Sequence, residues 1–213
     1  SGIVAKNVEQ LTLPDTLENM RGWYFRKFVK VKELHIPGSI KDFSCTLQNA
    51  GSLEKLYFDE GVEKISANSM VTGCKSLSEI DLPSTLKMIS GPSAFGGATA
   101  LTSIEFPKDV AFADTITGVL KGCTSLTSVS LPASVTKIPS HMFDGCTSLT
   151  SVTALSEIES IGDGAFQNCS SLTGIDFPGT LTSIGSSAFQ GCASLVSVPN
   201  LSKVTNMGWG AFY

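Results

Sequence analysis

The segment Gly164–Gly185 reads GAFQNCSSLTGIDFPGTLTSIG and is the clearest copy of a pattern that recurs along almost the whole chain. The pattern returns after about 23 residues, a spacing within the range of repeat architectures whose turns stack into an elongated array. Further copies follow Gly73, Gly97, Gly122, Gly145 and Gly191. A single turn of this size has no core of its own, so the stability of the array comes from each turn packing on its neighbours.

Aligned apolar positions indicate how the turns stack. An apolar-x-apolar stretch near the middle of each copy places two side chains on the same face of a short strand. A proline ends most of these strands, because proline cannot donate a hydrogen bond to a central ladder. The first apolar position of the strand recurs nine times and therefore predicts about nine turns, at Leu11, Leu34, Leu56, Ile80, Ile104, Val129, Val152, Ile175 and Val198.

Each copy closes with a large apolar residue such as Phe166, in a Gly-Ala-Phe-like turn or short helix. Since no linker interrupts the pattern, we predict one domain over residues 1–213, an α/β solenoid of short β-strands, turns and short helices. The copy between Pro107 and Cys123 contains extra residues and lacks the isoleucine of its last inward column, which predicts a bulge or surface loop.

The last copy stops at Tyr213, within the pattern. A solenoid needs its terminal apolar layer covered. Either Trp209 and Tyr213 cover that layer, or the chain is a piece of a longer array, and the second interpretation is the favoured one.

The composition indicates a folded protein and excludes some partners. Hydrophobic residues make up 42% of the chain and charged residues 16%, which is enough apolar material for an extended core. The formal net charge of −4 argues against nucleic acid and anionic membranes, which attract concentrated lysine and arginine. No apolar stretch is long enough to span a bilayer, and the first residues show no signal segment.

Five of the six cysteines occupy one column, at Cys74, Cys123, Cys146, Cys169 and Cys192. Alanine and phenylalanine fill this column in other copies, which indicates a buried apolar position where a thiol acts as a small hydrophobe. Adjacent turns would also bring these cysteines within disulfide range, so pairing stays an alternative. Cys45 lies outside the column, where partial exposure is expected.

No group of residues suggests catalysis. His35 and His141 fall in different columns, and no serine lies in a nucleophile-elbow context. Glycine motifs for phosphate or dinucleotide binding are absent from the sequence, and a straight row of thiols does not provide tetrahedral metal ligands. The sequence therefore predicts no enzymatic activity, no metal and no cofactor.

The outward positions of the strands form the candidate binding surface, because solenoids usually bind partners on such surfaces. Its candidate residues are His35, Tyr57, Glu79, Asp81 and Glu105. The three acids fall on adjacent turns, where like charges destabilise a sheet, so their presence favours a use in binding; the alternative is that they keep an exposed sheet soluble. The matching positions in the C-terminal half carry small polar residues and read as scaffold.

Trp23 is the sixth candidate binding residue. It lies in an aromatic cluster with Tyr24 and Phe25, between Arg21 and Arg26. Tryptophan and arginine are enriched where binding energy concentrates in interfaces. Covering the first turn as an N-terminal cap is the simpler alternative.

The line from Gly164 to Gly185 resembles the BspA-like leucine-rich repeat family, and the resemblance extends over residues 8–213. It is weaker before Gly73, where Leu47, Ala50 and Val62 replace the usual Phe, Cys and Leu. The resemblance implies a leucine-rich-repeat solenoid from an exported bacterial protein, secreted or at the cell surface, that adheres to host or matrix proteins or to other cells.

The expected function is therefore a protein-binding or adhesion module that uses the sheet surface. Its expected partners are a host extracellular or matrix protein, or another cell surface, with no nucleic acid and no membrane insertion. The alternative is a run of structural spacer repeats within a larger surface protein, with no ligand of their own.

Overall fold

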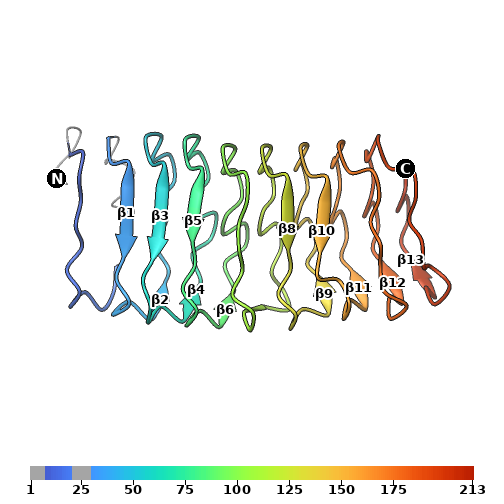
Figure 1. The fold of residues 1–213 in the computed structure, drawn as a ribbon, viewed down its shortest axis with the longest axis horizontal. Helices are drawn as coiled ribbons and strands as arrows, with labels where there is room; N and C mark the ends of the chain where they lie inside the picture. Colours follow the sequence, from blue (N-terminus) through green and yellow to red (C-terminus); the bar gives the residue numbers. More distant parts are fainter. Residues whose placement is uncertain (1–7, 21–29) are drawn as a thin grey trace.

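The computed structural model describes residues 8–20 and 30–213 and shows a parallel β-solenoid whose two termini lie at opposite ends of the long axis (Figure 1). Eight successive turns follow residue 30, and residues 8–20 belong to an earlier one. Eight of the nine predicted turns are thus described in full, and the first is described in part.

Two rows of short parallel strands run along the solenoid (Figure 1). The first row contains a three-stranded and a two-stranded sheet: β1 (Glu33–Ile36), β3 (Lys55–Phe58) and β5 (Glu79–Asp81), then β8 (Ser128–Ser130) and β10 (Ser151–Thr153). The second row contains β2 (Asp42–Phe43), β4 (Lys64–Ile65), β6 (Met88–Ile89) and β7 (Ala111–Phe112), then β9 (Lys137–Ile138), β11 (Ser160–Ile161), β12 (Ser183–Ile184) and β13 (Asn206–Met207).

The short helices predicted at the corners are wrong for the residues that the structure describes, which contain no helix. The corners are hydrogen-bonded turns instead. Within one corner the Cys169 amide donates to the Phe166 carbonyl at 3.1 Å, while the Phe166 amide donates to Ala188 of the next turn at 2.8 Å. Bonds of the second kind compete with helix formation, because an amide that pairs with a neighbouring turn cannot also pair four residues back in its own.

The core consists of the predicted inward columns. Its most regular part is a stack of phenylalanine rings in consecutive turns. The ring centroids lie 5.2 Å apart for Phe143–Phe166, 5.1 Å for Phe166–Phe189 and 5.0 Å for Phe189–Phe212, with interplanar angles of 18°, 6° and 2°. Each ring thus fills the space between two turns, and Phe143, Phe166 and Phe189 are buried.

A column of glycines allows adjacent turns to approach closely. It includes Gly162, Gly185 and Gly208, each directly after an inward strand residue. A Cβ at Gly185 would lie 2.5 Å from the Asp163 backbone nitrogen and 2.6 Å from the carbonyl carbon of Gly162. Real Cβ atoms essentially never come that close to other atoms, so a side chain here would force the two turns apart.

All six cysteines are free thiols. In the shared column each thiol donates to a carbonyl of the preceding turn; Cys146 Sγ, for example, lies 3.2 Å from the Leu120 oxygen, and Cys169 Sγ lies 3.1 Å from that of Phe143. The interpretation of this column as a buried apolar position agrees with these contacts. The expected partial exposure of Cys45 is wrong, because its side chain is buried and its thiol donates to the Met20 carbonyl at 2.6 Å.

We expect the native protein to react slowly with thiol reagents. Burial raises the pKa of Cys74 and Cys192 from 9.0 to about 11 and that of Cys123 to about 12, so little reactive thiolate forms at neutral pH. Titration with Ellman's reagent at pH 8 should show full reaction in denaturant and slow reaction without it, fastest at the half-buried Cys192. Equal rates in both conditions would contradict the buried column.

The same pKa shifts predict a loss of stability in alkali. The thiols have a higher pKa in the folded chain than in the unfolded chain. Their contribution to the free energy of unfolding is therefore complete below about pH 9 and declines as the pH rises toward their pKa values in the folded chain.

The strand rows are interrupted in the middle of the chain. In the first row β5 does not pair with the following turn, and Glu105 forms only an isolated bridge to Ser130. In the second row β7 pairs with β6 but not with β9. The break in the second row falls in the segment between Pro107 and Cys123, where the sequence predicts a bulge or surface loop, whereas the break in the first row lies before Pro107. The inward position expected to be lost there is occupied, because Phe112 lies opposite Ile89.

Candidate functional site

The solvent-facing side chains of β1, β3 and β5 form the surface that the sequence predicts as the binding site. Within each strand, inward residues are buried and alternate with more exposed outward ones. We call the outward set, with Glu105 of the next turn, the N-terminal sheet face. It consists of Glu33, His35, Lys55, Tyr57, Glu79, Asp81 and Glu105.

The strand register brings the predicted residues together in two lines. One line runs from Glu33 through Lys55 to Glu79. The other runs from His35 through Tyr57 to Asp81.

His35 and Tyr57 form an exposed aromatic pair. Their rings are stacked, with centroids 4.6 Å apart and an interplanar angle of 29°. The imidazole lies between two acids, with Nε2 3.2 Å from Glu33 Oε1 and Nδ1 3.5 Å from Asp59 Oδ1. These contacts hold the His35 ring of the pair in place.

Glu79 holds the other end of the pair. The Tyr57 hydroxyl donates to Glu79 Oε1 at 2.9 Å, and Lys55 Nζ lies 3.6 Å from Glu79 Oε2. Partial desolvation and the bond to Glu79 raise the pKa of Tyr57, so the phenol remains a hydrogen-bond donor. The sequence places Glu79 in an acidic patch with Asp81 and Glu105, and in the structure Lys55 on the neighbouring strand offsets the charge of Glu79.

Asp81 and Glu105 differ from the other acids of this face in their ion pairing. Among the described residues neither takes part in an ion pair within 4.0 Å. They line a surface groove of about 310 Å³ at the interruption of the first strand row. The groove is also lined by Leu82, Ser84, Phe106, Pro107, Lys108 and Asp109.

Trp23 lies outside the residues that the structure describes, so its candidate role stays a prediction. At the opposite end of the chain, Trp209 is 81% exposed and Tyr213 is 83% exposed. The interpretation of these two residues as a cover for the last apolar layer is therefore wrong. A surface pocket of about 510 Å³ opens there, beside Phe189 and Phe212.

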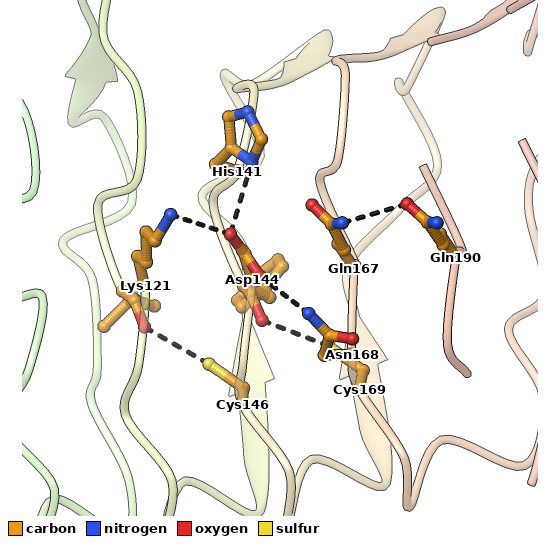
Figure 2. Close-up of polar contacts among 10 residues, drawn as sticks. Lys121, His141, Asp144, Cys146, Gln167, Asn168, Cys169 and Gln190 are labelled. Atoms are coloured by element: carbon orange, nitrogen blue, oxygen red, sulfur yellow. Dashed lines mark hydrogen bonds and ion pairs between the residues drawn. The ribbon is translucent and has the colours of Figure 1, made fainter. Parts of the chain in front are cut away.

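A second polar cluster, which the sequence did not indicate, surrounds Asp144 (Figure 2). Asp144 is the one buried charged residue of the described chain. Its Oδ2 lies 2.8 Å from Lys121 Nζ and 3.4 Å from His141 Nδ1, while Asn168 Nδ2 donates to Oδ1 at 3.4 Å. Because Lys121, Asp144 and Asn168 come from three consecutive turns, the cluster joins the turn of β7 to the two turns that follow it.

The sequence does carry a signal for this cluster, namely a repeat position that is polar in successive copies. The search for apolar columns did not consider that position. The position holds Lys121, Asp144, Gln167 and Gln190 in successive copies, and Gln167 donates to Gln190 at 2.9 Å. We assign the cluster a structural role, since its groups bond to one another. Within residues 8–20 and 30–213, no three His, Cys, Asp or Glu side chains are grouped as metal ligands.

Comparison with known proteins gives a family match over nearly the whole chain. A profile of the "BspA type Leucine rich repeat region" matches residues 4–117 and 117–213, in six copies. Among curated proteins no sequence matches significantly. In the described part of the chain, no helix is long and apolar enough to cross a membrane.

Similar solved structures are bacterial repeat proteins. A leucine-rich repeat protein from Bacteroides ovatus is 27% identical, with a TM-score of 0.75 over 90% of this chain and 49% of that one. The present chain thus spans about half the length of that protein. A leucine-rich repeat protein of T. pallidum is 25% identical, with a TM-score of 0.56 over 83% of this chain and 73% of that one. One from Eubacterium ventriosum, 21% identical with a TM-score of 0.60 over 87% and 68%, supports the fold alone.

Proposed function

Because the chain belongs to the BspA-type leucine-rich repeat family, we propose that it is a protein-binding or adhesion module of a secreted or cell-surface bacterial protein. It binds through the N-terminal sheet face. Its partner is a host extracellular or matrix protein, or a protein on another cell surface. Repeat arrays of this kind present extended surfaces on a rigid backbone, which suits recognition of a macromolecule more than catalysis.

The main support for this proposal is the uneven distribution of charged and aromatic residues over the sheet. Four carboxylates, one lysine and the His35–Tyr57 stack gather on β1, β3, β5 and the Glu105 position. The matching positions on β8 and β10 hold only serine and threonine. A sheet that merely needed solubility would not require its charged and aromatic groups on one half. The small polar residues on the second half of the sheet favour the alternative function, in which the chain, or part of it, is a structural spacer.

Charge reversal at Asp81 and Glu105 separates the two functions. We expect the Asp81→Lys/Glu105→Lys variant to bind its partner at least about tenfold more weakly, because both changed side chains are outward-facing and would repel a complementary surface. The measurement compares capture of purified extracellular-matrix and serum proteins by immobilised wild type and variant, followed by titration of any retained protein.

Asp176→Lys is the matched control. Asp176 occupies the same outward strand position in a later turn, away from the N-terminal sheet face. Circular dichroism and thermal melting should show that both variants fold. Equal capture by wild type and the double variant would contradict binding at this face, and no capture of any protein by wild type would favour the spacer function.

A further inference from the structure

We infer that the N-terminal sheet face binds an arginine side chain of the partner, with the guanidinium stacked on Tyr57 and paired with Asp81 and Glu105. This inference rests on the proposed function and adds the chemistry of the ligand to it. It follows from the aromatic stack, from the two carboxylates that form no ion pair and from the groove between their turns.

Tyr57 offers one ring face to a ligand. His35 covers the face directed toward the N-terminal turns, at a centroid distance of 4.6 Å. The next strand places Asp81 opposite Tyr57. Because an aspartate side chain is shorter than a phenol ring, we expect a step above Asp81 beside the second ring face. The hydrogen bond from Tyr57 to Glu79 holds the ring in this orientation.

The charges around this step fit a cation. Lys55, the only lysine of the face, is paired with Glu79, and His35 contacts Glu33 and Asp59. Asp81 and Glu105 line the adjacent groove of about 310 Å³. The groove is lined by three carboxylates, Asp81, Glu105 and Asp109, and by one lysine, Lys108. A cation in the groove would therefore meet a net negative charge.

Arginine matches this arrangement better than lysine. Its guanidinium is planar, so one face can stack on an aromatic ring while its N–H groups bond to carboxylates in the plane. Adjacent strands lie about 4.8 Å apart, so a group above Asp81 lies within stacking distance of Tyr57. A lysine ammonium can satisfy the carboxylates but has no plane to stack.

Three labelled peptides of equal length test this inference. Each carries three identical charged residues separated by glycine and serine, and the charged residue is arginine, lysine or glutamate. Fluorescence anisotropy at low ionic strength measures the affinity of each peptide for the folded chain. We expect the arginine peptide to bind about two- to fivefold more tightly than the lysine peptide, and the glutamate peptide not to bind.

Variants assign the preference to individual groups. Tyr57→Leu should reduce the affinity for the arginine peptide to that for the lysine peptide. Tyr57→Phe loses the bond to Glu79 but keeps the ring and its stack on His35, so the arginine peptide should still bind more tightly than the lysine peptide. Asp81→Asn/Glu105→Gln should weaken both cationic peptides by about fivefold or more. The control Asp176→Asn, in a later turn, should change neither affinity.

Equal binding of the arginine and lysine peptides to wild type would overturn the inference, as would an arginine preference that survives Tyr57→Leu, or no binding of either cationic peptide. These failures are distinct from failure of the proposed function. If a captured matrix or serum protein is lost on charge reversal while arginine is not preferred, the face is a binding site and the arginine assignment alone is wrong.

Discussion

Replacing Phe166 with alanine is expected to lower the free energy of unfolding by about 3–5 kcal/mol, the usual loss for a buried phenylalanine. The Phe166 side chain is fully buried, and its ring stacks on those of Phe143 and Phe189 in the two adjacent turns. Its removal leaves a cavity where the turn of Phe166 packs against the turns on both sides. The glycine and cysteine contacts nearby limit how far these turns can close around the space.

Urea unfolding followed by circular dichroism measures this change. Phe212→Ala is the matched control, because Phe212 belongs to the same column but is 42% exposed and stacks only on Phe189 among the described residues. We expect a clearly smaller loss for the control. A loss below about 1 kcal/mol for Phe166→Ala would mean that the stack contributes little to stability.

The second large effect is expected for Gly185→Ala. The added methyl group would meet backbone atoms of Asp163 and Gly162, which cannot move aside as a side chain can, as well as the Asp163 carboxylate. The turns would have to separate, and the hydrogen bond from the Gly185 amide to the Ile161 carbonyl, now 2.8 Å, would lengthen. We expect a loss of about 1–3 kcal/mol in the free energy of unfolding, as for other overpacked sites.

Gly179→Ala controls for the removal of a glycine. A Cβ at Gly179 would have no neighbouring atom within 4 Å, and the residue is not in the left-handed region. Alanine there should leave the urea midpoint unchanged or raise it slightly, since it restricts the unfolded chain. Equal midpoints for the two variants would contradict the close approach of turns at Gly185.

Periodicity predicted the core because a repeated turn leaves little freedom. The positions of Leu172 and Phe166 are apolar in most copies, so stacking of the turns puts both side chains in the core, where both are fully buried. The corners were misread for a physical reason. A Gly-Ala-Phe segment is compatible with a turn or a helix, and its hydrogen bonds to neighbouring turns decide between them.

The candidate site could be predicted in part. Alternation along the strands identifies Tyr57 and Asp81 as outward residues, and the repeat register places them opposite each other. Side-chain conformations lie beyond such reasoning. The stacking of Tyr57 on His35, the pairing of Glu79 with Lys55 and the groove beside Glu105 depend on rotamers and on a local loss of strand pairing. The Asp144 cluster was missed because a polar column gives no signal in a search for apolar ones.

We expect the interrupted strand rows to weaken the coupling between the N-terminal and the C-terminal turns. In a repeat array, folding cooperativity passes only between neighbouring turns, so a boundary with fewer hydrogen bonds is where partial unfolding stops. The first row is interrupted after β5 and again after β10, and the second row is interrupted after β7. The breaks after β5 and β7 lie on the two sides of one turn, which contains Glu105 and β7. The N-terminal sheet face lies almost entirely on one side of this boundary. We therefore expect fraying that begins at the exposed C-terminal layer to slow before it reaches the His35–Tyr57 stack.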